Sequence, residues 1–384
     1  MLLLAAILLS ECAIRLDSVP TGSPGLSDDL DVQSLREAIR QSLVYLQKLP
    51  PDRVVGETPR RFTAKQVADS LLAFQPLLEL WSCRECVARE IATRFDLVPS
   101  APDPASAEVL FMGYYQPVID GSLTRTEKFR VPIYGKPPDL ITAERVTLTP
   151  KARVERIVGR AQGEQFVPYY SRREIDGAGV LQGQGLEIAW VENPIDVFFL
   201  HIQGSGLIRL QNGRQLPVGY AAQNGWPYRS IGRLLIDDGK IPREEMSMQR
   251  LRHYLTENPR EQDEIFSYNE SYVFFRVLEG GPLGSLEVPV TAGRSIATDA
   301  RLFPKGALVW IQTEVPVIDN AGGLTGWRPI SRFVLNQDTG GAIRGLQRAD
   351  LYFGTGEEPA ALAGYMNRPG KMYFLMLKRD AAGR

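Results

Sequence analysis

Residues 336–356 read NQDTGGAIRGLQRADLYFGTG, and this stretch places two aspartates in contrasting settings. Asp338 lies in a glycine-rich turn, whereas Asp350 lies in an apolar run that is typical of a strand. A third aspartate, Asp299, lies upstream in TAGRSIATDARLFPKG. We expect all three at strand ends or turns of one small β-unit. Aspartates in such turns often bond only to nearby backbone N–H groups, so a purely structural role stays open for each.

The tripeptide that begins at Asp338, Asp-Thr-Gly, is also the signature of pepsin-like proteases, in which two aspartates share one proton. Such a protease needs a second Asp-Thr-Gly or Asp-Ser-Gly, and the sequence contains neither. The like-charge pair that this chemistry requires is therefore missing, which argues against a protease.

The composition predicts about two domains around a sizeable core. The chain has 384 residues, of which 44% are hydrophobic, and domains usually have about 100–200 residues each. Its 35 glycines and 27 prolines favour turns and short strands over a helix bundle. The net charge of −1 argues against a nucleic-acid partner.

The periodicity of apolar residues predicts helices first and strands later. We expect helices within residues 31–49 and 62–97, a strand at 109–117, a helix at 150–161 and a buried strand at 196–203. Asn212-Gly213 predicts a hairpin turn, residues 231–254 predict two short helical segments, and strands recur from residue 271 onward. The fold class is therefore α+β, with mostly antiparallel strands.

Metal or cofactor chemistry finds little support in the sequence. The only histidines are His201 and His253, which disfavours a Ser-His-Asp triad or a multi-histidine zinc site. Cys83 and Cys86 form a lone C-x-x-C without a second pair. We expect packing or surface cysteines there, with a disulfide as the alternative in an exported chain. No cofactor and no metal site are expected.

The N-terminus begins with an apolar run, MLLLAAILL, which is too short to span a bilayer and is typical of a signal-peptide core. The following LSEC departs from a lipoprotein cleavage box, because Glu11 occupies a position where a small residue is expected. We therefore expect export, with lipid attachment at Cys12 and a plain apolar start as open alternatives.

Several long motifs in one order resemble the membrane-bound lytic murein transglycosylase A (MltA) family. They extend over residues 113–356, and the similarity as a whole runs from about residue 109 to 377. The motifs are GYYQP (113–117), YYSRREID (169–176), WVENPIDVFFLHIQGSG (190–206), VGYAAQNGWPYRSIG (218–232), NESYVFFR (269–276), PLGSLEVPVTAGRSIATD (282–299), QDTGGAIRG (337–345) and ADLYFGTG (349–356).

This resemblance implies a fold that is mostly β, in which a smaller β-domain is inserted into a double-psi β-barrel behind N-terminal helices. The implied divisions are a signal or lipoprotein-like segment with a linker (1–30), helices and the start of the barrel (31–115), the inserted β-domain (116–240), and the rest of the barrel (241–384). A glycan groove is expected between the two domains.

The resemblance also implies a lytic transglycosylase that cleaves the β-1,4 bond between N-acetylmuramic acid and N-acetylglucosamine and leaves 1,6-anhydromuramic acid ends. Asp350 maps to the single acid and base, with Asp299 and Asp338 in support. Two alternatives are a non-catalytic peptidoglycan-binding protein and a hydrolase of β-1,4 glycans. The implied partners are peptidoglycan glycan strands, and we expect a monomer in the periplasm, with the outer membrane as the site if Cys12 carries lipid.

A single acid that later acts as a base needs a pKa above the free value of about 3.9. Burial beside Leu351, Tyr352 and Phe353, or a second ionised aspartate, would raise the pKa of Asp350. Candidates for holding the sugars are Tyr115 and Gln116, where the insert begins, Gln203 and Ser205, at the end of its main strand, and Tyr272, where the chain returns to the barrel. For the tyrosines, packing in the core is the alternative.

Overall fold

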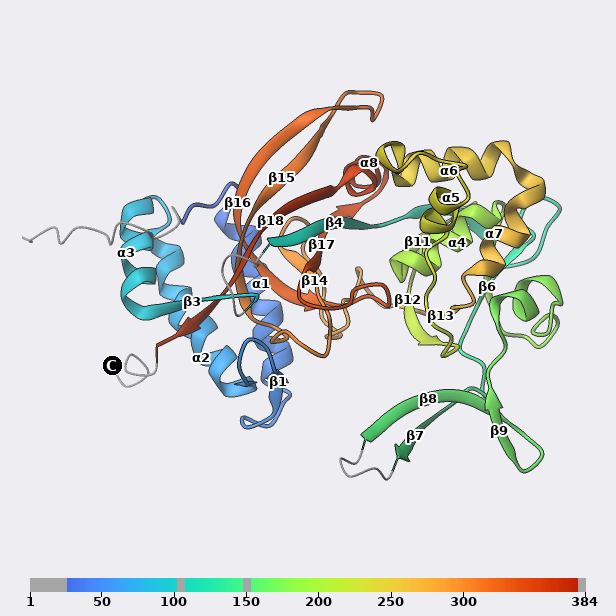
Figure 1. Cartoon of the computed structure of the whole chain (residues 1–384), viewed down its shortest axis with the longest axis horizontal. Coiled ribbons are helices and arrows are strands. Elements are labelled where there is room, and N and C mark those ends of the chain that lie inside the picture. Colours follow the sequence, from blue (N-terminus) through green and yellow to red (C-terminus); the bar gives the residue numbers. More distant parts are fainter. Residues whose placement is uncertain (1–25, 102–107, 148–152, 379–384) are drawn as a thin grey trace, which may run out of the picture.

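The computed structural model of the chain describes residues 26–101, 108–147 and 153–378 (Figure 1). A β-barrel occupies the middle of the molecule, N-terminal helices cover one of its sides, and a second β-rich part lies on the other side. A three-stranded arm projects from that second part.

The barrel is a ring of six strands, because its first and last strands also pair with each other. In ring order the strands are β15 (Leu308–Ile318), β16 (Leu324–Asp338), β14 (Ser295–Ala297), β17 (Arg348–Thr355), β4 (Glu108–Gln116) and β18 (Asn367–Leu377). The pairs β14–β16 and β17–β4 are parallel, and the others are antiparallel. A further strand, β3 (Phe95–Pro99), pairs with β18. The expected barrel of mostly antiparallel strands is confirmed.

The barrel core explains why these segments are strands. Trp310, Phe333, Leu351 and Phe374 come from four different strands, and each is at most 1% exposed. Branched and aromatic side chains of this kind favour strands, because they pack well against neighbours on a pleated surface. The strands expected near residues 308–315, 333–337 and 372–377 are confirmed.

The N-terminal helices form where the apolar spacing predicts them. They are α1 (Val32–Leu46), α2 (Ala64–Phe74), the 3₁₀ turn η1 (Gln75–Leu80) and α3 (Arg84–Arg94). The Asp31 side chain caps α1, and Thr63 with Gln66 forms a capping box at α2. Before α2, the short strands β1 (Val54–Gly56) and β2 (Phe62–Thr63) pair with each other. A disulfide joins Cys83 to Cys86 at the start of α3, so the disulfide alternative is the one the structure shows.

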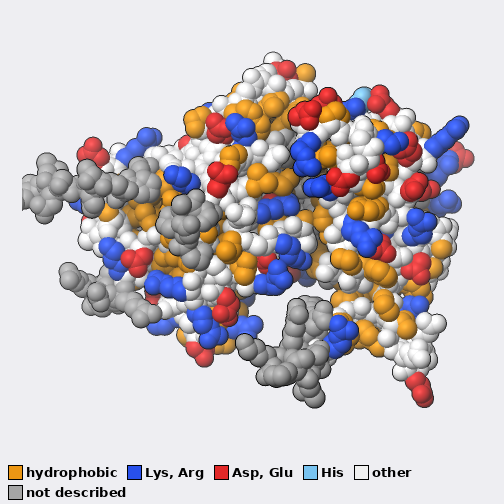
Figure 2. Space-filling model, in the orientation of Figure 1, with side chains coloured by type: hydrophobic (Ala, Val, Ile, Leu, Met, Phe, Trp, Pro, Cys, Tyr) orange, Lys and Arg blue, Asp and Glu red, His pale blue; other side chains and the backbone are white. Residues whose placement is uncertain are grey.

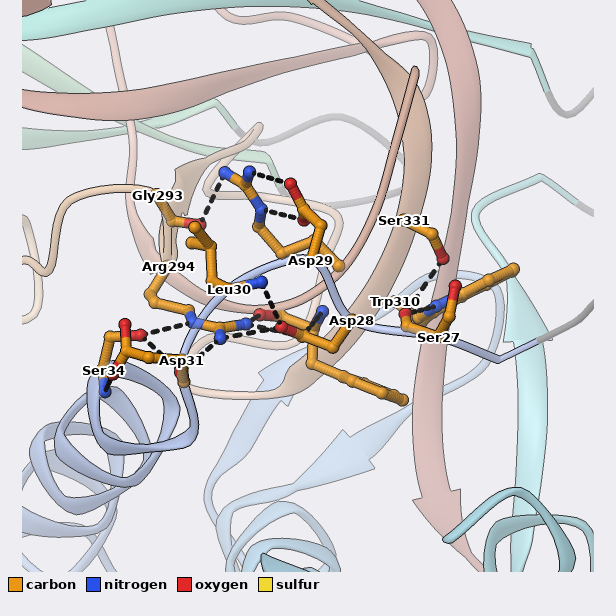
Figure 3. A network of polar contacts seen from close by, with 12 residues as sticks. Ser27, Asp28, Asp29, Leu30, Asp31, Ser34, Gly293, Arg294, Trp310 and Ser331 are labelled. Carbon is orange, nitrogen blue, oxygen red and sulfur yellow. Dashed lines mark hydrogen bonds and ion pairs between the residues drawn. The ribbon is translucent and has the colours of Figure 1, made fainter. Parts of the chain in front are cut away.

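The segment that precedes α1 is bound tightly to the barrel (Figure 3). Asp28 forms a bidentate ion pair with Arg294, at 2.6 and 2.8 Å, and both side chains are almost completely buried. Asp29 pairs with Arg332, and the backbone oxygen of Ser27 accepts a hydrogen bond from the Trp310 indole. The first described residues are therefore part of the barrel's own structure. The apolar run 1–9 and Cys12 lie outside the described residues.

The second part contains a six-stranded sheet. Its order is β13 (Val273–Val277), β12 (Gln215–Gln223), β11 (Ser205–Leu210), β5 (Val118–Ser122), β10 (Glu187–Val191) and β6 (Val131–Tyr134). A bridge between Gly135 and Phe275 brings its two edges together. The predicted turn at Asn212-Gly213 joins β11 to β12 and is confirmed. Because β13 belongs to this sheet, we propose that the inserted domain ends near residue 277, beyond the division at residue 240 inferred from the sequence.

The expected strand at residues 196–203 is wrong, because the structure has a helix there, α4 (Pro194–Gln203). Asn193 caps the helix, Pro194 occupies its first turn, and Gly204 ends it with a φ of 77°. A short, continuous apolar run does not by itself distinguish a buried strand from a buried helix. The flanking residues carried the deciding signal, since a cap with proline marks a helix start and a left-handed glycine marks its end.

The expected helix at residues 150–161 is also wrong. Residues 153–162 form strand β8 (Arg153–Gln162), which pairs with β7 (Ile141–Thr147) and β9 (Gln165–Pro168) in the projecting arm. Pairing on both sides satisfies the backbone of β8 and overrides its local helical spacing. Residues 150–152, where the expected helix would begin, lie outside the described residues.

The remaining helices pack around α4 or against the barrel. Around α4 lie α5 (Ile231–Asp237), α6 (Met248–Glu257) and α7 (Gln262–Tyr268), with the short turns η3 (Arg173–Gly177), η4 (Arg243–Glu245) and η5 (Pro259–Glu261) in the same domain. Helix α8 (Glu357–Tyr365) packs on β4 and β17. The two short helical segments expected within 231–254 are confirmed. None of the helices among the described residues is both long and apolar enough to cross a membrane.

Candidate functional site

A long groove separates the barrel from the inserted domain, with a volume of about 1870 Å³. Its barrel wall includes Asp299, Asp338 and Asp350, and its other wall includes Gln203 and Ser205. Figure 2 shows Lys and Arg side chains gathered where the two halves of the molecule meet. Pockets for drug-sized ligands are usually about 300–1,000 Å³, so this groove is large enough for several sugar rings.

The barrel topology brings the three aspartates to this groove. Ala297 in β14 pairs with Asp338 on one neighbouring strand and with Asp350 on the other. Asp299 follows two residues after Ala297 along the chain. Residues that are 51 positions apart in the sequence, Asp299 and Asp350, therefore lie at one end of three adjacent strands.

Asp350 is a buried carboxyl group with one charged partner. It is 8% exposed, and both of its oxygens accept hydrogen bonds from Arg348, from Nε at 2.9 Å and from Nη2 at 3.0 Å. Burial raises the pKa of Asp350, and the Arg348 guanidinium only partly opposes this effect. Among the aspartates that the structure describes, none contributes to this pKa shift, so burial is the cause that the structure supports.

Asp338 lies at the end of β16 in the glycine-rich turn. Its Oδ1 accepts hydrogen bonds from the backbone N–H of Ser285 at 2.9 Å and of Thr339 at 2.8 Å. Burial raises the pKa of Asp338, while these two N–H groups and Lys305 oppose the rise. The turn thus fixes this carboxyl group through backbone contacts.

Asp299 has the largest set of hydrogen bonds of the three. It accepts from the Arg301 side chain at 3.1 and 2.8 Å, from the Arg301 backbone at 3.0 Å, and from the Gly345 N–H at 2.9 Å. Burial alone would raise its pKa, but the guanidinium and the two N–H groups outweigh burial and hold the pKa of Asp299 well below its usual range. Asp299 is therefore an ionised anchor that ties the loop at residue 345 to β14.

Lys305 binds these strand ends together from the interior. Its ammonium group donates to the backbone oxygen of Asp338 at 2.7 Å and contacts Thr298 and Asn336. Burial lowers the pKa of Lys305 to about 8, although Asp338 and Asp299 oppose the change. On the other side of β16, the Gln337 amide donates to the Ala38 backbone oxygen in α1. The N-terminal helices therefore help to hold the strand that ends at Asp338.

The five residues expected to hold sugars fall into two groups. Gln203 is the last residue of α4, Ser205 is the first residue of β11, and both line the groove. Tyr115, Gln116 and Tyr272 are at most 6% exposed and do not line it.

These three buried residues have partners in the protein interior instead. The Tyr115 N–H donates to the Gln203 side chain at 3.0 Å, and Gln116 accepts from Thr355 at 2.9 Å. The Tyr272 ring packs on the His201 ring, with 4.3 Å between centroids. Their position suits support of the groove wall.

The candidates chosen from the sequence did not include Tyr114, Tyr228 or Arg348. All three line the groove. Tyr114 packs on Tyr352, with 5.1 Å between ring centroids, and no hydrogen bond of ordinary geometry satisfies its hydroxyl. Burial, then the nearby Asp338, raises the pKa of Tyr114. A signal for Arg348 was present, because residues two apart on a strand share a face.

Two family models match the chain. The MltA specific insert domain matches residues 110–276, and the 3D domain matches residues 294–376. The second range contains all three aspartates and most of the barrel strands. The barrel, the inserted domain and the acid-lined groove together define a lytic transglycosylase fold.

Individual relatives agree with these matches. Membrane-bound lytic murein transglycosylase A of Escherichia coli K12 is 35% identical over 270 residues, which is 70% of this chain and 65% of that protein, so the alignment spans a little under two thirds of the relative. The crystal structure of a membrane-bound lytic murein transglycosylase from Agrobacterium tumefaciens has a TM-score of 0.73 and 30% identity, covering 91% of this chain and 94% of that one. E. coli MltA with bound chitohexaose has a TM-score of 0.68 and 28% identity, with 92% of each chain covered. The chain belongs to the MltA family.

Proposed function

We propose that this protein is a lytic transglycosylase that cleaves the β-1,4 bond between N-acetylmuramic acid and N-acetylglucosamine in peptidoglycan without consuming water. The observation that carries the proposal is the environment of Asp350. Its carboxyl group is buried, its pKa is raised, and it lines a groove that is large enough for several sugar rings. An acid must hold its proton near neutral pH, and burial is a physical means to that end. The E. coli relative has been solved with bound chitohexaose, which supports a glycan strand as the ligand of this protein.

The proposed reaction uses one carboxyl group twice. Protonated Asp350 donates its proton to the bridging oxygen as the bond between that oxygen and C1 of muramic acid breaks. The C6 hydroxyl of the same sugar attacks C1, and its proton passes to the Asp350 carboxylate. The products are a 1,6-anhydromuramic end and a free hydroxyl on the leaving sugar, and Asp350 regains its proton. Attack within one ring removes much of the entropic cost of bringing a nucleophile to the carbon.

The other carboxyl groups of the described groove lining support this chemistry over hydrolysis. A hydrolase needs a second carboxylate that activates water or attacks the sugar. Asp299 is occupied by Arg301 and Gly345, Asp338 accepts from two backbone N–H groups, and Glu287 pairs with Arg276 on the exposed rim. We therefore propose that none of these three carboxylates acts as a second base.

Product analysis on purified murein sacculi tests the proposal. We expect soluble fragments with 1,6-anhydromuramic ends from the wild-type protein and none from Asp350→Asn. Digestion in ¹⁸O-labelled water adds a second readout, since a transglycosylase leaves its product ends unlabelled. Labelled reducing ends would identify a hydrolase instead. Binding to sacculi without any soluble product would identify a wall-binding protein.

Direct sugar contacts are proposed for Gln203 and Ser205, because both line the groove. For Tyr115, Gln116 and Tyr272 we propose support of that wall through their neighbours. Replacing Gln203 with Ala should weaken binding of chitohexaose about 5- to 30-fold, the effect of one or two hydrogen bonds. Isothermal titration with Asp350→Asn as the background separates this binding effect from turnover.

The apolar run at residues 1–9 supports the further proposal that the protein is exported and acts as a periplasmic monomer, with an outer-membrane anchor if Cys12 is lipidated. Relatives are named as membrane-bound proteins. Metabolic labelling with a tagged fatty acid, compared between wild type and Cys12→Ser, tests the anchor. Label on the wild type alone supports lipidation, and label on neither leaves export without an anchor. Full-length protein in the cytoplasmic fraction would contradict export.

A further inference from the structure

We propose that Arg348 is a positioning residue for Asp350: it holds the carboxylate in place between proton donation and proton return, and it sets the pH at which Asp350 loses its proton. This inference rests on the function proposed above, because it assigns a partner to the same acid. It adds a residue that lies in β17 itself, two positions before Asp350.

The strand geometry fixes this pair. Arg348 and Asp350 point to the same side of β17, since alternate residues of a strand share a face. The backbone of β17 is held by pairing of Arg348 with Leu110 and of Asp350 with Met112, both in β4, while Ala297 in β14 pairs with Asp350 from the other side. The fork formed by Nε and Nη2 contacts both carboxyl oxygens, and Nη1 donates to the Ala342 backbone oxygen at 3.3 Å. Neither partner can shift far without breaking one of these contacts.

The chemistry needs such a partner because Asp350 becomes charged during the reaction. After the proton leaves, an isolated carboxylate in a buried site would be strongly unfavourable. A planar guanidinium that already contacts both oxygens stabilises that charge without moving. Arg348 is itself 27% exposed in its side chain, so its own charge keeps contact with solvent. Burial therefore lets Asp350 hold a proton, and Arg348 lets it release one.

The other titratable groups around Asp350 do not share this role. The phenols in the groove wall are weak acids, and burial raises the pKa of Tyr114 and of Tyr228 further. Lys305 contacts the Asp338 backbone, and Arg301 is paired with Asp299. From α8, Tyr365 also lines the groove. Among the described residues, Arg348 is thus the cation that forms an ion pair with Asp350.

The structure offers a matched control in the pair of Arg301 with Asp299. That pair also joins residues two apart, is also bidentate, and also lines the groove. Arg348→Gln and Arg301→Gln therefore remove the same charge from the same groove, but only the first removes it from Asp350. Arg348→Lys keeps the charge and removes the planar fork.

The experiment measures kcat/KM for release of anhydro ends across a range of pH. Activity requires protonated Asp350, so the alkaline side of the profile reports loss of its proton. Removing the neighbouring cation raises the pKa of Asp350, and we expect the alkaline limb of Arg348→Gln to move to higher pH. Turnover at the optimal pH should fall about 10- to 100-fold, because the Asp350 carboxylate that forms during the reaction loses the Arg348 guanidinium that stabilises it. In Arg348→Lys the limb should return toward that of the wild type, and in Arg301→Gln it should not move.

An unshifted limb in a folded Arg348→Gln variant would overturn the inference, and so would an equal shift in Arg301→Gln. If Arg348→Gln does not fold, Arg348→Lys is the test variant. We then expect its turnover to be lower than that of the wild type, while the alkaline limb of its pH profile stays close to that of the wild type. A wild-type protein that releases no anhydro ends would contradict the proposed function instead. The Arg348 inference is then tested by ¹³C NMR titration of the Asp350 carboxyl group, which should lose its proton at higher pH in Arg348→Gln than in the wild type.

Discussion

The pairs Arg348–Asp350 and Arg301–Asp299 join the same two chemical groups and face the same groove, but the pKa values of their carboxyl groups are shifted in opposite directions. The pKa of Asp350 is raised, chiefly by burial, whereas the pKa of Asp299 is lowered despite burial. Two differences contribute to this contrast. Two backbone N–H groups donate to Asp299, whereas none within the described part of the chain donates to Asp350. Burial also raises the pKa of Asp350 more than the Arg348 guanidinium lowers it, whereas at Asp299 the Arg301 guanidinium and the backbone donors outweigh burial. A bidentate arginine therefore does not by itself decide the direction in which the pKa of a buried aspartate is shifted.

From this contrast we propose different roles for the three aspartates of this barrel. Asp299 is held by the loop at Gly345 and by its own turn, as a structural anion would be. Within the described part of the chain, the hydrogen-bond partner of the Asp350 carboxyl group is the Arg348 side chain, and Asp350 lines the groove, as the proposed proton donor must. Asp338 is intermediate, with a raised pKa but two backbone donors.

The largest expected effect comes from Asp350→Asn. The amide cannot donate a proton, so release of anhydro ends should fall by at least about 10²–10⁴-fold. Chitohexaose binding should stay near that of the wild type, because the rest of the groove is unchanged. Parallel turnover and binding assays check this. If a folded Asp350→Asn variant kept normal turnover while a folded Asp338→Asn variant was inactive, the catalytic acid would be Asp338 in the glycine-rich turn.

The next effect concerns stability. The two backbone N–H groups donate to different oxygens of Asp299. In Asp299→Asn one of them therefore faces an amide NH₂, and the free energy of unfolding should fall by about 1–3 kcal/mol. Urea denaturation followed by circular dichroism measures this. The comparison fails if Asp299→Asn keeps full stability but loses turnover, since Asp299 would then take part in the chemistry.

The pH dependence of unfolding should have opposite signs for the two carboxyl groups. The folded pKa of Asp299 is lowered, so its contribution to stability is present above the unfolded value of about 3.9 and is lost as the pH falls below it. The folded pKa of Asp350 is raised, so stability is lost as the pH rises through the interval above about 3.9.

Relative to wild type, Asp299→Asn should therefore be least stable at neutral pH and approach the wild type in acid. Asp350→Asn should gain relative stability between acid and neutral pH. Denaturation at several pH values gives the free energy of unfolding of each variant relative to the wild type, and hence its slope against pH. Slopes of the same sign for the two variants would contradict the opposite pKa shifts of Asp299 and Asp350.

The smallest expected effect is that of Arg301→Gln. The Arg301 side chain is 69% exposed, and exposed ion pairs contribute about 0–1 kcal/mol. Asp299 keeps its two backbone donors, so the variant should remain close to the wild type in urea denaturation. A loss comparable to that of Asp299→Asn would show that the guanidinium, and not the backbone, anchors the loop.

The sequence by itself determined the larger parts of this protein. The ordered motifs identified the family and the barrel, apolar spacing located α1–α3 and the strands from residue 308, and Asn212-Gly213 located a hairpin. These features are local or repeat over many residues, so their signal survives without knowledge of the fold. Single-sequence spacing failed for α4 and β8, where capping residues in one case and sheet pairing in the other decided the outcome.

The tertiary structure alone decided how each candidate residue is placed. The motifs GYYQP (113–117) and NESYVFFR (269–276) could place Tyr115, Gln116 and Tyr272 either in the groove lining or in the interior, and packing buried all three. The states of the three aspartates likewise depend on neighbours that approach from distant segments, such as Ser285 at Asp338 and Gly345 at Asp299. Motifs record which carboxyl groups are present, but a pKa depends on burial and on donors within a few ångströms, which only the folded chain supplies.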